Sequence, residues 1–289
     1  MAEPDRTIRF TNLDKVLFLQ KRITKGDLVR YYIRLAPRMI PYLEGRAVML
    51  HRFPDGIGQP GFYVKNAPPG TPPWVTTTLH HSVTAGRDIR YIVCDRPETL
   101  AWLANMASVE LHITLSGVKS PEVPQFAFFD LDPEPPDGFP EARAVALELR
   151  DLMRETGNRP YVKTSGKRGL HVLVPLREDF TFPVVRDAVH ALGIILSRKL
   201  PGVASDAAKA RGGGMVLVDY AQNAAWKTMI CPYSLRAREE ATVSTPLSWE
   251  ELEAGVRPED FNIETVSSRQ GDPWDGIVPD RQDLWVERP

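Results

Sequence analysis

The stretch of sequence that decides the fold is Tyr161-Val-Lys-Thr-Ser-Gly-Lys-Arg-Gly-Leu-His-Val-Leu-Val174. Residues 161–164 and 170–174 are mostly apolar, β-branched or aromatic, which is typical of strands. Only residues 165–169 join them, and this connection is too short for the crossover that parallel strands need. The two strands must therefore form an antiparallel hairpin.

Other predicted elements surround this hairpin. Short apolar runs predict strands at residues 47–51, 91–94, 125–129 and 215–218. Helical spacing of apolar residues predicts helices at residues 25–44, 97–109, 140–157 and 184–200. We expect Thr24 to cap the first helix, Pro37 to kink or restart it, and Gly45 to end it. Because strands and helices do not alternate as βα pairs, the sequence predicts an α+β fold with a largely antiparallel sheet flanked by helices.

The composition is that of a globular chain. The 289 residues are 43% hydrophobic and 25% charged, which suffices for one large core or two modest ones. No apolar run approaches the length of about eighteen residues that a membrane span needs, and the N-terminus has no signal peptide. Cys94 and Cys231 lie far apart, which excludes a Cys-x-x-Cys zinc motif. We therefore expect a single cytoplasmic domain over residues 1–289, with no membrane partner.

Charge is distributed unevenly along the chain. The net charge is −1 at pH 7, but residues 1–50 carry ten basic and five acidic side chains, whereas residues 239–289 carry four and 13. A basic N-terminal region suggests that one surface meets a polyanion such as nucleic acid. Charged faces that contact only solvent are the alternative explanation.

A pair of aspartates follows a second apolar segment, Phe126-Ala-Phe-Phe-Asp-Leu-Asp-Pro133. Asp130 and Asp132 are two residues apart, so strand geometry places both on one face. Carboxylates this close repel each other unless a cation or proton lies between them, and Mg²⁺ or Mn²⁺ prefers such oxygen ligands. The alternative is a turn at the strand end, with solvated aspartates and Pro133 as the strand breaker.

Asp219 ends another apolar segment, Met215-Val-Leu-Val-Asp219. Three aspartates at the ends of two strands could hold two metal ions for in-line phosphoryl or nucleotidyl transfer. Taken alone, Asp219 also fits an ordinary strand terminus.

The tip of the hairpin has the residue types of a phosphate-binding loop. Glycines let backbone N–H groups turn inward, Ser165 adds a hydroxyl donor, and Lys167 or Arg168 adds positive charge. The tip matches neither Gly-x-x-x-x-Gly-Lys-Ser/Thr nor Gly-x-Gly-x-x-Gly. A plain surface hairpin with a basic tip is the alternative.

Two other segments have residues suited to phosphate or nucleotide contacts. In an expected strand at residues 233–238, Arg236 and Arg238 share one face and could clamp phosphate oxygens. His112 precedes the aspartate pair by 18 residues and could reach a nucleotide, although a lone histidine is often structural.

Two aromatic residues could bind a base. Phe62 and Tyr63 lie near Lys65 and a segment rich in proline and glycine, where they could stack on an exposed base. Packing in the core is the alternative.

Together these motifs resemble the polymerase domain of bacterial and archaeal DNA ligase D, a member of the archaeo-eukaryotic primase superfamily that serves non-homologous end joining. The resemblance extends from Thr11-Asn-Leu-Asp-Lys-Val-Leu-Phe18 to Gly271-Asp-Pro-Trp274. The landmarks between them keep the family order: Ile23-Thr-Lys-Gly-Asp27, Arg52-Phe-Pro-Asp-Gly56, Lys65-Asn-Ala-Pro-Pro-Gly70, Phe129-Asp-Leu-Asp-Pro133, Lys163-Thr-Ser-Gly166, Gly169-Leu-His-Val172, Val218-Asp-Tyr220 and Pro232-Tyr-Ser-Leu-Arg236. So many ordered matches are far more specific than any single one.

The resemblance implies a role for each of these residues. Asp130, Asp132 and Asp219 match the catalytic, metal-binding carboxylates. The positions that match nucleotide-binding residues of the family are Ser165, Lys167, Arg168, Gly169, His171, Arg236, His112, Arg52 and Lys65. The positions that match DNA-binding residues are Lys15 and Lys25, which would grip a recessed 5′-phosphate, and Phe62 and Tyr63, which would meet the template.

The resemblance also implies the architecture. It predicts an archaeo-eukaryotic primase-like catalytic core at residues 110–240. A basic DNA-end-binding region at residues 1–50 would precede the core, and an acidic segment at residues 241–289 would follow it.

The implied activity is that of a template-directed nucleotidyltransferase that fills gaps or extends primers at double-strand breaks, with a family preference for ribonucleotides. One metal ion, held by all three aspartates, would activate the primer 3′-hydroxyl, and a second would hold the triphosphate. The implied cofactor is Mn²⁺ or Mg²⁺. The implied partners are DNA ends with a recessed 5′-phosphate, nucleoside triphosphates, a DNA ligase and an end-binding Ku-like protein, at the nucleoid of a prokaryotic cell.

The sequence departs from the family pattern at three places. The hairpin tip, Gly166-Lys-Arg-Gly169, leaves open whether Lys167 or Arg168 contacts the phosphate. Glycines at positions 212–214 stand where relatives often carry a basic residue, and Tyr63 replaces a second phenylalanine.

Two other classes of function stay open at this stage. A haloacid-dehalogenase-like phosphohydrolase also uses Asp-x-Asp after an apolar strand, but it usually continues with Thr or Val and Gly, whereas Pro133-Glu-Pro135 follows here. A non-catalytic adaptor would hold DNA ends together through Lys15 and Lys25.

Overall fold

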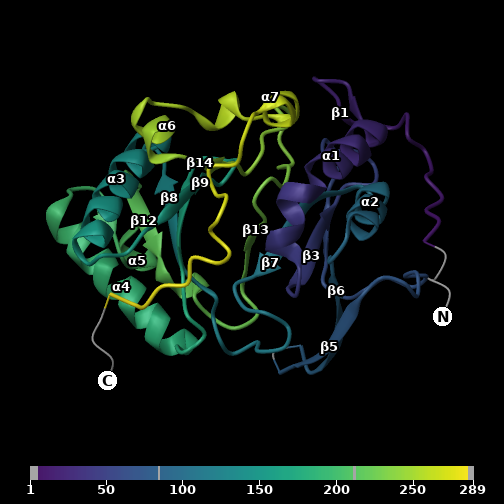
Figure 1. Cartoon of the computed structure of the whole chain (residues 1–289). Coiled ribbons are helices and arrows are strands. Elements are labelled where there is room, and N and C mark those ends of the chain that lie inside the picture. The colour runs from purple at the N-terminus through teal and green to yellow at the C-terminus, as the bar shows by residue number, and fades with distance from the viewer. Residues whose placement is uncertain (1–5, 84, 211–212, 286–289) are drawn as a thin grey trace. The chain divides into compact units, whose positions relative to one another are not determined.

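The computed structural model describes residues 6–83, 85–210 and 213–285 (Figure 1). Of the glycines at positions 212–214, position 212 lies outside these described residues. The chain divides into two compact units that alternate along the sequence. The first unit comprises the described residues of Met1–Thr114, Ile230–Val243 and Asn262–Arg269, and the second those of Leu115–Met229, Ser244–Phe261 and Gln270–Pro289. The single domain over residues 1–289 stays a prediction.

The first unit is built on a sheet in the order β13-β7-β3-β6-β5, with β4 beside β3, and on a separate pair, β1 and β2. Its strands are β1 (Val16–Phe18), β2 (Ile23–Thr24), β3 (Ala47–Arg52), β4 (Phe62–Val64), β5 (Thr77–Ser82), β6 (Arg87–Val93), β7 (Ser108–Thr114) and β13 (Thr228–Ile230), in which the chain returns to this unit. Its helices are α1 (Lys25–Leu43), α2 (Pro97–Asn105) and α7 (Ile263–Ser268).

The capping of α1 matches the sequence prediction. The backbone N–H of Asp27 donates to the Thr24 hydroxyl, and the backbone N–H of Thr24 donates to the Asp27 carboxylate, which closes a capping box. Gly45, with φ +68°, follows the end of the helix. The helix nevertheless continues through Pro37 as one element. The packing of a buried face that includes Tyr32 holds it in place where propensity alone would not.

The second unit is built on a sheet in the order β11-β12-β8-β10-β9-β14, in which, among the described strands, β11 and β12 pair in parallel and the other neighbours antiparallel. Its strands are β8 (Phe126–Glu134), β9 (Tyr161–Thr164), β10 (Leu170–Pro175), β11 (Val203–Ala204), β12 (Met215–Asp219) and β14 (Pro246–Leu247). Its helices are α3 (Phe139–Glu155), α4 (Phe182–Lys199), α5 (Ala207–Ala210), α6 (Trp249–Glu253), η1 (Tyr220–Gln222) and η2 (Pro258–Asp260). The predicted β9–β10 hairpin and the largely antiparallel α+β fold are confirmed.

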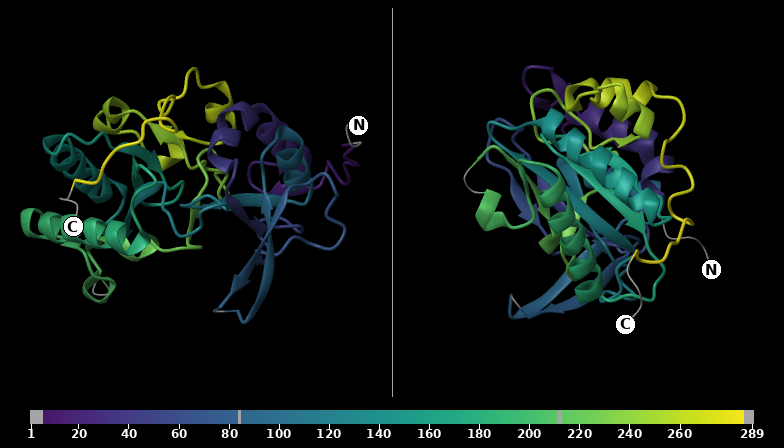
Figure 2. Two further views of the ribbon diagram at one scale, coloured as in Figure 1. Left: turned by 60° about the horizontal axis from the view of Figure 1, so that its bottom comes forward. Right: turned by 90° about the vertical axis from the view of Figure 1, so that its left-hand side faces the viewer.

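The two long helices of the second unit cover one face of its sheet (Figures 1 and 2). Both α3 and α4 contact β8 and each other. Gly193 of α4 lies so near β12 that an added Cβ would be 3.6 Å from the Val218 side chain. Since side chains alternate along a strand, Asp219 projects from the opposite face. α4 therefore covers one face of the sheet and leaves the face with the aspartates uncovered.

β8 is longer than the sequence suggested. The predicted strand ended at Phe129, but β8 continues to Glu134, so Asp130 and Asp132 lie within the strand and not in a turn after it. Pro133 does not break the strand. Its neighbour β10 pairs with β8 only as far as Leu131, so Pro133 has a strand partner on one side alone, a position where proline is tolerated.

Two other predicted elements are wrong in extent or kind. The helix predicted to reach Val109 ends at Asn105, and a positive φ of +56° at Ala107 leads into β7. The expected strand at 233–238 does not form, because Tyr233 has a φ of +66° and the chain turns.

Candidate active site

A row of polar side chains crosses the sheet of the second unit. Asp130 on β8 lies directly opposite Asp219 on β12 and His171 on β10, and His171 lies opposite Lys163 on β9. Directly opposed residues project from the same face of a sheet. The fold therefore brings together two predicted metal ligands that are distant in sequence, with His171 beside them.

Asp132 lies on the same face, two residues along β8. Burial raises the pKa of its carboxyl, and the negative charge of Asp130 raises it further, with contributions from Glu134 and Asp219, while Arg168 opposes them. These carboxylates repel each other, so a bound cation would lower the energy of the group. Their oxygen ligands and unrelieved charge fit a hard divalent cation.

The carboxylates share a face without being drawn to one point. Oδ1 of Asp219 accepts the backbone N–H of Ala221 at 3.0 Å, and Oδ2 accepts the side chain of Gln222 at 2.8 Å. Nε2 of His171 lies 3.4 Å from Oδ1 of Asp130. Among the described residues, no three His, Cys, Asp or Glu side chains are already gathered as metal ligands. Each carboxylate oxygen keeps a second lone pair, so these contacts orient Asp219 without preventing metal coordination.

The hairpin tip is closed by Ser165. Its Oγ accepts the backbone N–H groups of Lys167 and Gly169, each at 3.2 Å, and its own N–H donates to the Gly169 carbonyl at 3.0 Å. A Cβ at Gly169 would lie 2.3 Å from the Leu131 carbonyl oxygen, so only glycine lets the tip approach β8 this closely. The exposed Lys167 and Arg168 follow Gly166, and the charge of Arg168 acts on Asp132.

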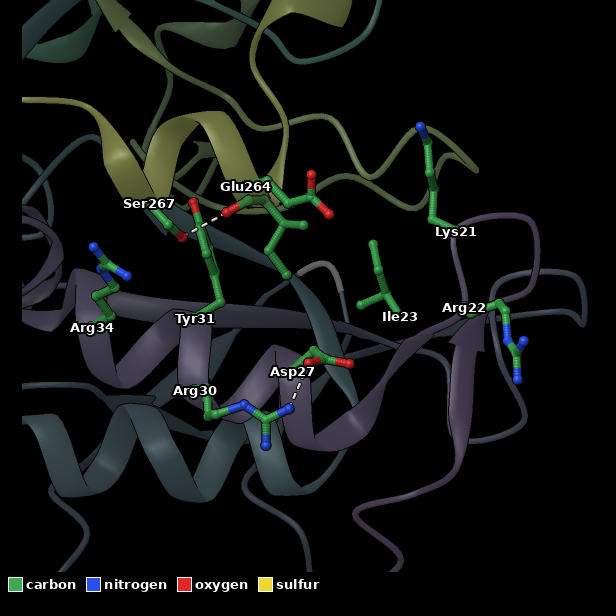
Figure 3. Close-up of a pocket in the computed structure, with 10 residues that line it drawn as sticks. Lys21, Arg22, Ile23, Asp27, Arg30, Tyr31, Arg34, Glu264 and Ser267 are labelled. Carbon is green, nitrogen blue, oxygen red and sulfur yellow. Dashed lines mark hydrogen bonds and ion pairs between the residues drawn. The ribbon is translucent and has the colours of Figure 1, made fainter.

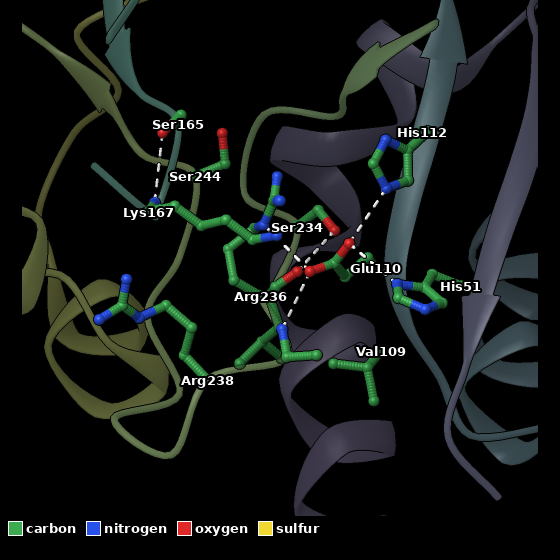
Figure 4. Close-up of polar contacts among 12 residues, drawn as sticks. His51, Val109, Glu110, His112, Ser165, Lys167, Ser234, Arg236, Arg238 and Ser244 are labelled. Carbon is green, nitrogen blue, oxygen red and sulfur yellow. Dashed lines mark hydrogen bonds and ion pairs between the residues drawn. The ribbon is translucent and has the colours of Figure 1, made fainter. Parts of the chain in front are cut away.

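A second polar cluster lies in the first unit, around Glu110 on β7 (Figure 4). The Glu110 side chain is 1% exposed. It accepts hydrogen bonds from Nδ1 of His51 and Nε2 of His112, each at 3.2 Å. Nε of Arg236 lies 3.1 Å from its other oxygen, which also accepts the backbone N–H of Ala237 at 3.0 Å. The cluster thus joins two predicted nucleotide-binding residues, His112 and Arg236.

The charges in this cluster compensate each other. Burial alone would raise the pKa of Glu110, but the hydrogen bond from His112, the charge of Arg236 and the N–H of Ala237 hold that pKa far below its usual range. Burial lowers the pKa of His112, although Glu110 opposes this. At neutral pH the cluster therefore contains a charged Glu110 and a neutral His112.

The predicted base-stacking residues are on the surface of the first unit. Phe62 is 46% and Tyr63 58% exposed, so neither packs in the core. The Arg52 guanidinium lies 5.4 Å from the centre of the Phe62 ring, and its Nε donates to the Met106 carbonyl at 2.9 Å. Lys65 is exposed and lines, with Tyr63, a pocket of about 490 Å³.

The two predicted 5′-phosphate lysines are in the same part of the first unit. Lys15 pairs with Asp55 at 2.7 Å. Lys25 is only 5% exposed, and its Nζ donates to the Thr11 hydroxyl at 3.2 Å. Burial lowers the pKa of Lys25, and the positive charge of Lys15 lowers it further. An anion bound beside these two ammonium groups would relieve this repulsion.

The structure also shows site residues that the sequence prediction missed. Glu110 and His51 were not predicted, and the only signal in the sequence was the alternation of Glu110 and His112 along one strand. Arg238, predicted to share a face with Arg236, instead pairs with Glu240 at 3.4 Å.

A separate pocket of about 450 Å³ lies on the first unit beside α1 and α7 (Figure 3). Four basic side chains line it, namely Lys21, Arg22, Arg30 and Arg34. Arg30 is already paired with Asp27. None of the predicted site residues lines this pocket, so it is not the candidate active site.

Aspartates on one face of an antiparallel sheet, next to a hairpin with a basic tip, define the class of the chain as a nucleotidyltransferase domain. Residues 24–274 match the sequence model of the LigD primase-polymerase domain, and the chain belongs to this family. The family predicted from the ordered motifs is thereby confirmed. The polymerase domain of this family is a metal-dependent nucleotidyltransferase.

Individual relatives agree with this assignment. The chain is 34% identical over 281 residues to the bifunctional non-homologous end joining protein LigD of Bacillus subtilis, covering 96% of this chain and 45% of that protein. It is 30% identical over 284 residues to the multifunctional non-homologous end joining protein LigD of Pseudomonas aeruginosa, covering 95% and 33%. The chain therefore spans less than half of these curated relatives.

A solved structure has the same fold. The polymerase domain from Mycobacterium tuberculosis ligase D, in complex with DNA, matches with a TM-score of 0.88 and 30% identity, covering 96% of this chain and all of that one. Within the described ranges, no helix is both long and apolar enough to cross a membrane.

Proposed function

We propose that this chain is a template-directed polymerase that extends primers and fills short gaps at DNA double-strand breaks during non-homologous end joining. The observation that carries the proposal is the direct pairing of Asp130 with Asp219, with Asp132 on the same face, in a member of the LigD primase-polymerase family. The proposed pathway follows the relatives, which are named as end-joining proteins.

Asp130, Asp132 and Asp219 are the residues that would hold Mn²⁺ or Mg²⁺. Support for this comes from the raised pKa of Asp132, which burial raises most and the negative charges of Asp130, Glu134 and Asp219 raise further. Such ions, when bound, supply Lewis acidity that stabilises charge at the reacting phosphate. His171, 3.4 Å from Asp130, restricts the orientation of that carboxylate.

The hairpin tip would bind the triphosphate. Ser165 keeps the loop closed, so that Lys167 and Arg168 project from a rigid turn. Gly169 keeps this turn against β8, the strand of Asp130. Arg168 is the better placed of the two basic residues to offset negative charge near the aspartates, because its charge already acts on Asp132.

Residues of the first unit are also proposed to bind nucleotide and DNA. Arg236 and His112 are proposed to contact the nucleotide, together with Arg52 and Lys65. Lys15 and Lys25 would bind the 5′-phosphate of a recessed end, for which the repulsion between their ammonium groups is the physical support. The exposed rings of Phe62 and Tyr63 would stack on template bases.

Two partners are proposed from the resemblance. A DNA ligase would seal the filled gap, and a Ku-like protein would hold the ends. The preference for ribonucleotides has the same basis.

Family membership decides against the phosphohydrolase alternative. A non-catalytic adaptor is the remaining alternative, and the two differ in one measurement. We expect the chain to extend the primer of a gapped duplex with a 5′-phosphate in the presence of Mn²⁺ or Mg²⁺, more efficiently with ribonucleotides. Asp130→Asn should reduce extension by about 10³-fold, because the metal contributes several kcal/mol.

The controls separate the parts of the proposal. Removing the 5′-phosphate should weaken extension by wild type but not by Lys15→Ala. DNA binding without extension under either metal would support the adaptor and contradict the polymerase. Equal extension by Asp130→Asn would contradict the assignment of the carboxylates.

A further inference from the structure

The buried carboxylate of Glu110 contacts two residues to which the proposed function assigns nucleotide contacts (Figure 4). Its Oε2 accepts from His51 and His112. Its Oε1 lies beside Nε of Arg236 and accepts the backbone N–H of Ala237. Oε2 thus has two hydrogen-bond donors, and Oε1 has one donor and an ion pair with Arg236, all within the first unit.

The partners come from separate segments of the chain. His51 on β3 is directly opposite Glu110 in the register of the sheet, and His112 is two residues along β7. Arg236 belongs to the segment after β13, which has no regular strand. The backbone N–H of Arg236 donates to the Thr242 carbonyl at 2.8 Å, which fixes the backbone of Arg236 but not the direction of its side chain.

This segment is attached to β7 at a second place, which fixes its path. The backbone N–H of Leu111 donates to the Ser234 hydroxyl at 2.9 Å, and the N–H of Cys231 donates to the Leu111 carbonyl at 2.8 Å. These contacts locate the backbone of the segment. They leave the direction of the Arg236 side chain to Glu110.

The network extends to an exposed aromatic ring. The His51 ring stacks on Tyr63, with ring centres 4.0 Å apart and an angle of 13° between the planes. Tyr63 also meets His112 edge-on at 6.0 Å. Glu110 therefore orients the His51 ring on which Tyr63 stacks.

Stability alone does not explain a buried carboxylate at this position. A buried ion pair contributes little net stability, because desolvation offsets the attraction, and apolar side chains of similar size often stabilise as well. Orientation is what a carboxylate adds. With Nε of Arg236 ion-paired to Glu110 at 3.1 Å, the terminal nitrogens of the guanidinium are available to bind phosphate oxygens. With Nε2–H of neutral His112 directed at Glu110, Nδ1 becomes an acceptor for a nucleotide donor.

We propose that Glu110 is a positioning residue of the polymerase, which orients Arg236 for phosphate and selects the tautomer of His112. It does not touch the reacting atoms. The proposal rests on the nucleotide-binding roles of these two residues in the proposed function.

The test is the Glu110→Gln variant, in which the side chain keeps its size but one oxygen becomes an NH₂ donor facing other donors. The matched control is Ser108→Ala, which changes another buried side chain of β7. We expect Glu110→Gln to raise the Kd and KM for nucleoside triphosphate by about 10- to 100-fold. Losing a side chain that orients a metal-binding residue weakens metal binding by a similar factor. Binding of the 5′-phosphorylated DNA end by Glu110→Gln should match that of wild type. The melting curve of Ser108→Ala should also match that of wild type.

A cycle with the Arg236→Ala/His112→Ala double variant separates positioning from a purely structural role. If Glu110 acts through Arg236 and His112, adding Glu110→Gln to that double variant should change nucleotide affinity by less than about twofold. A structural carboxylate would produce the same fold-loss in both backgrounds, and that result would overturn the proposal.

The two proposals fail in different ways. A wild-type chain that binds a fluorescent nucleoside triphosphate but extends no primer contradicts the polymerase, while nucleotide affinity still tests Glu110. Unchanged nucleotide affinity in Glu110→Gln contradicts the role of Glu110 even if wild type is an active polymerase.

Discussion

Each unit holds a polar cluster, built on one carboxylate in the first unit and on three in the second, and the clusters differ in how their charge is balanced. In the first unit, Glu110 is surrounded by His51, His112 and Arg236, and its pKa is far below the usual range. In the second unit, burial and neighbouring carboxylates raise the pKa of Asp132. The direction of the pKa shift thus separates a carboxylate whose partners outweigh the effect of burial from one in which burial and like charges outweigh the opposing cation.

This difference indicates what each cluster can do. The Glu110 cluster is complete, so its ligand must bind to the groups that Glu110 orients. The aspartates on β8 and β12 have no comparable balance of charge, which supports the proposed cation. Perturbed pKa values accompany functional sites in both cases, and the like charges that add to the raised pKa of Asp132 favour a bound cation.

Neutral isosteres of Glu110 and Asp132 are expected to give the largest difference in stability between the two clusters. Glu110→Gln should lower the free energy of unfolding at pH 7 by about 1–3 kcal/mol, because it leaves buried donors unsatisfied beside Arg236. Asp132→Asn should leave it unchanged or raise it, since it removes like-charge repulsion. Urea unfolding of the two variants measures both. A larger loss for Asp132→Asn than for Glu110→Gln would reverse the comparison.

A smaller effect is the opposite pH dependence of the two sites. Glu110 has a depressed pKa, so its contribution to stability is present above the ordinary value of 4.5 and is lost as the pH falls below it. Asp132 has a raised pKa, so its contribution is present below 3.8 and is lost as the pH rises through the raised pKa.

The measurement is urea unfolding of wild type and both variants in the acid range. The stability that wild type has over Glu110→Gln should decrease toward low pH, and the stability that it has over Asp132→Asn should decrease toward high pH. Parallel pH profiles for both pairs would contradict the assignment of opposite pKa shifts.

The sequence predicted the parts of the fold that depend on neighbouring residues. The short link between two apolar segments dictated the β9–β10 hairpin, and Thr24 with Asp27 dictated the start of α1. The end of β8 was not predictable, because Pro133 is tolerated only where β10 has stopped, which is a property of the assembled sheet. The loss of the expected strand at 233–238 depends on the positive φ of Tyr233, a residue type that seldom adopts it.

In the candidate site, too, features that depend on neighbouring residues were predictable and those that depend on strand pairing were not. The spacing of Asp130 and Asp132 predicted a shared face because alternation along a strand is local. The position of Asp219 opposite Asp130 needed the β8–β12 register. Glu110 was not predicted because His51 and Arg236, which it contacts, come from β3 and from the segment after β13. No spacing in the sequence indicates that these residues lie together.

The effect of Mn²⁺ alone on unfolding tests most directly whether the aspartates of β8 and β12 form a cation site. At a concentration about a hundred times the Kd, wild type should gain about 2.7 kcal/mol in the free energy of unfolding. Glu110→Gln should gain the same amount, and Asp132→Asn should gain less than half of it. If Mn²⁺ stabilised Asp132→Asn as much as wild type, or stabilised neither, the aspartates of β8 and β12 would not be the cation site.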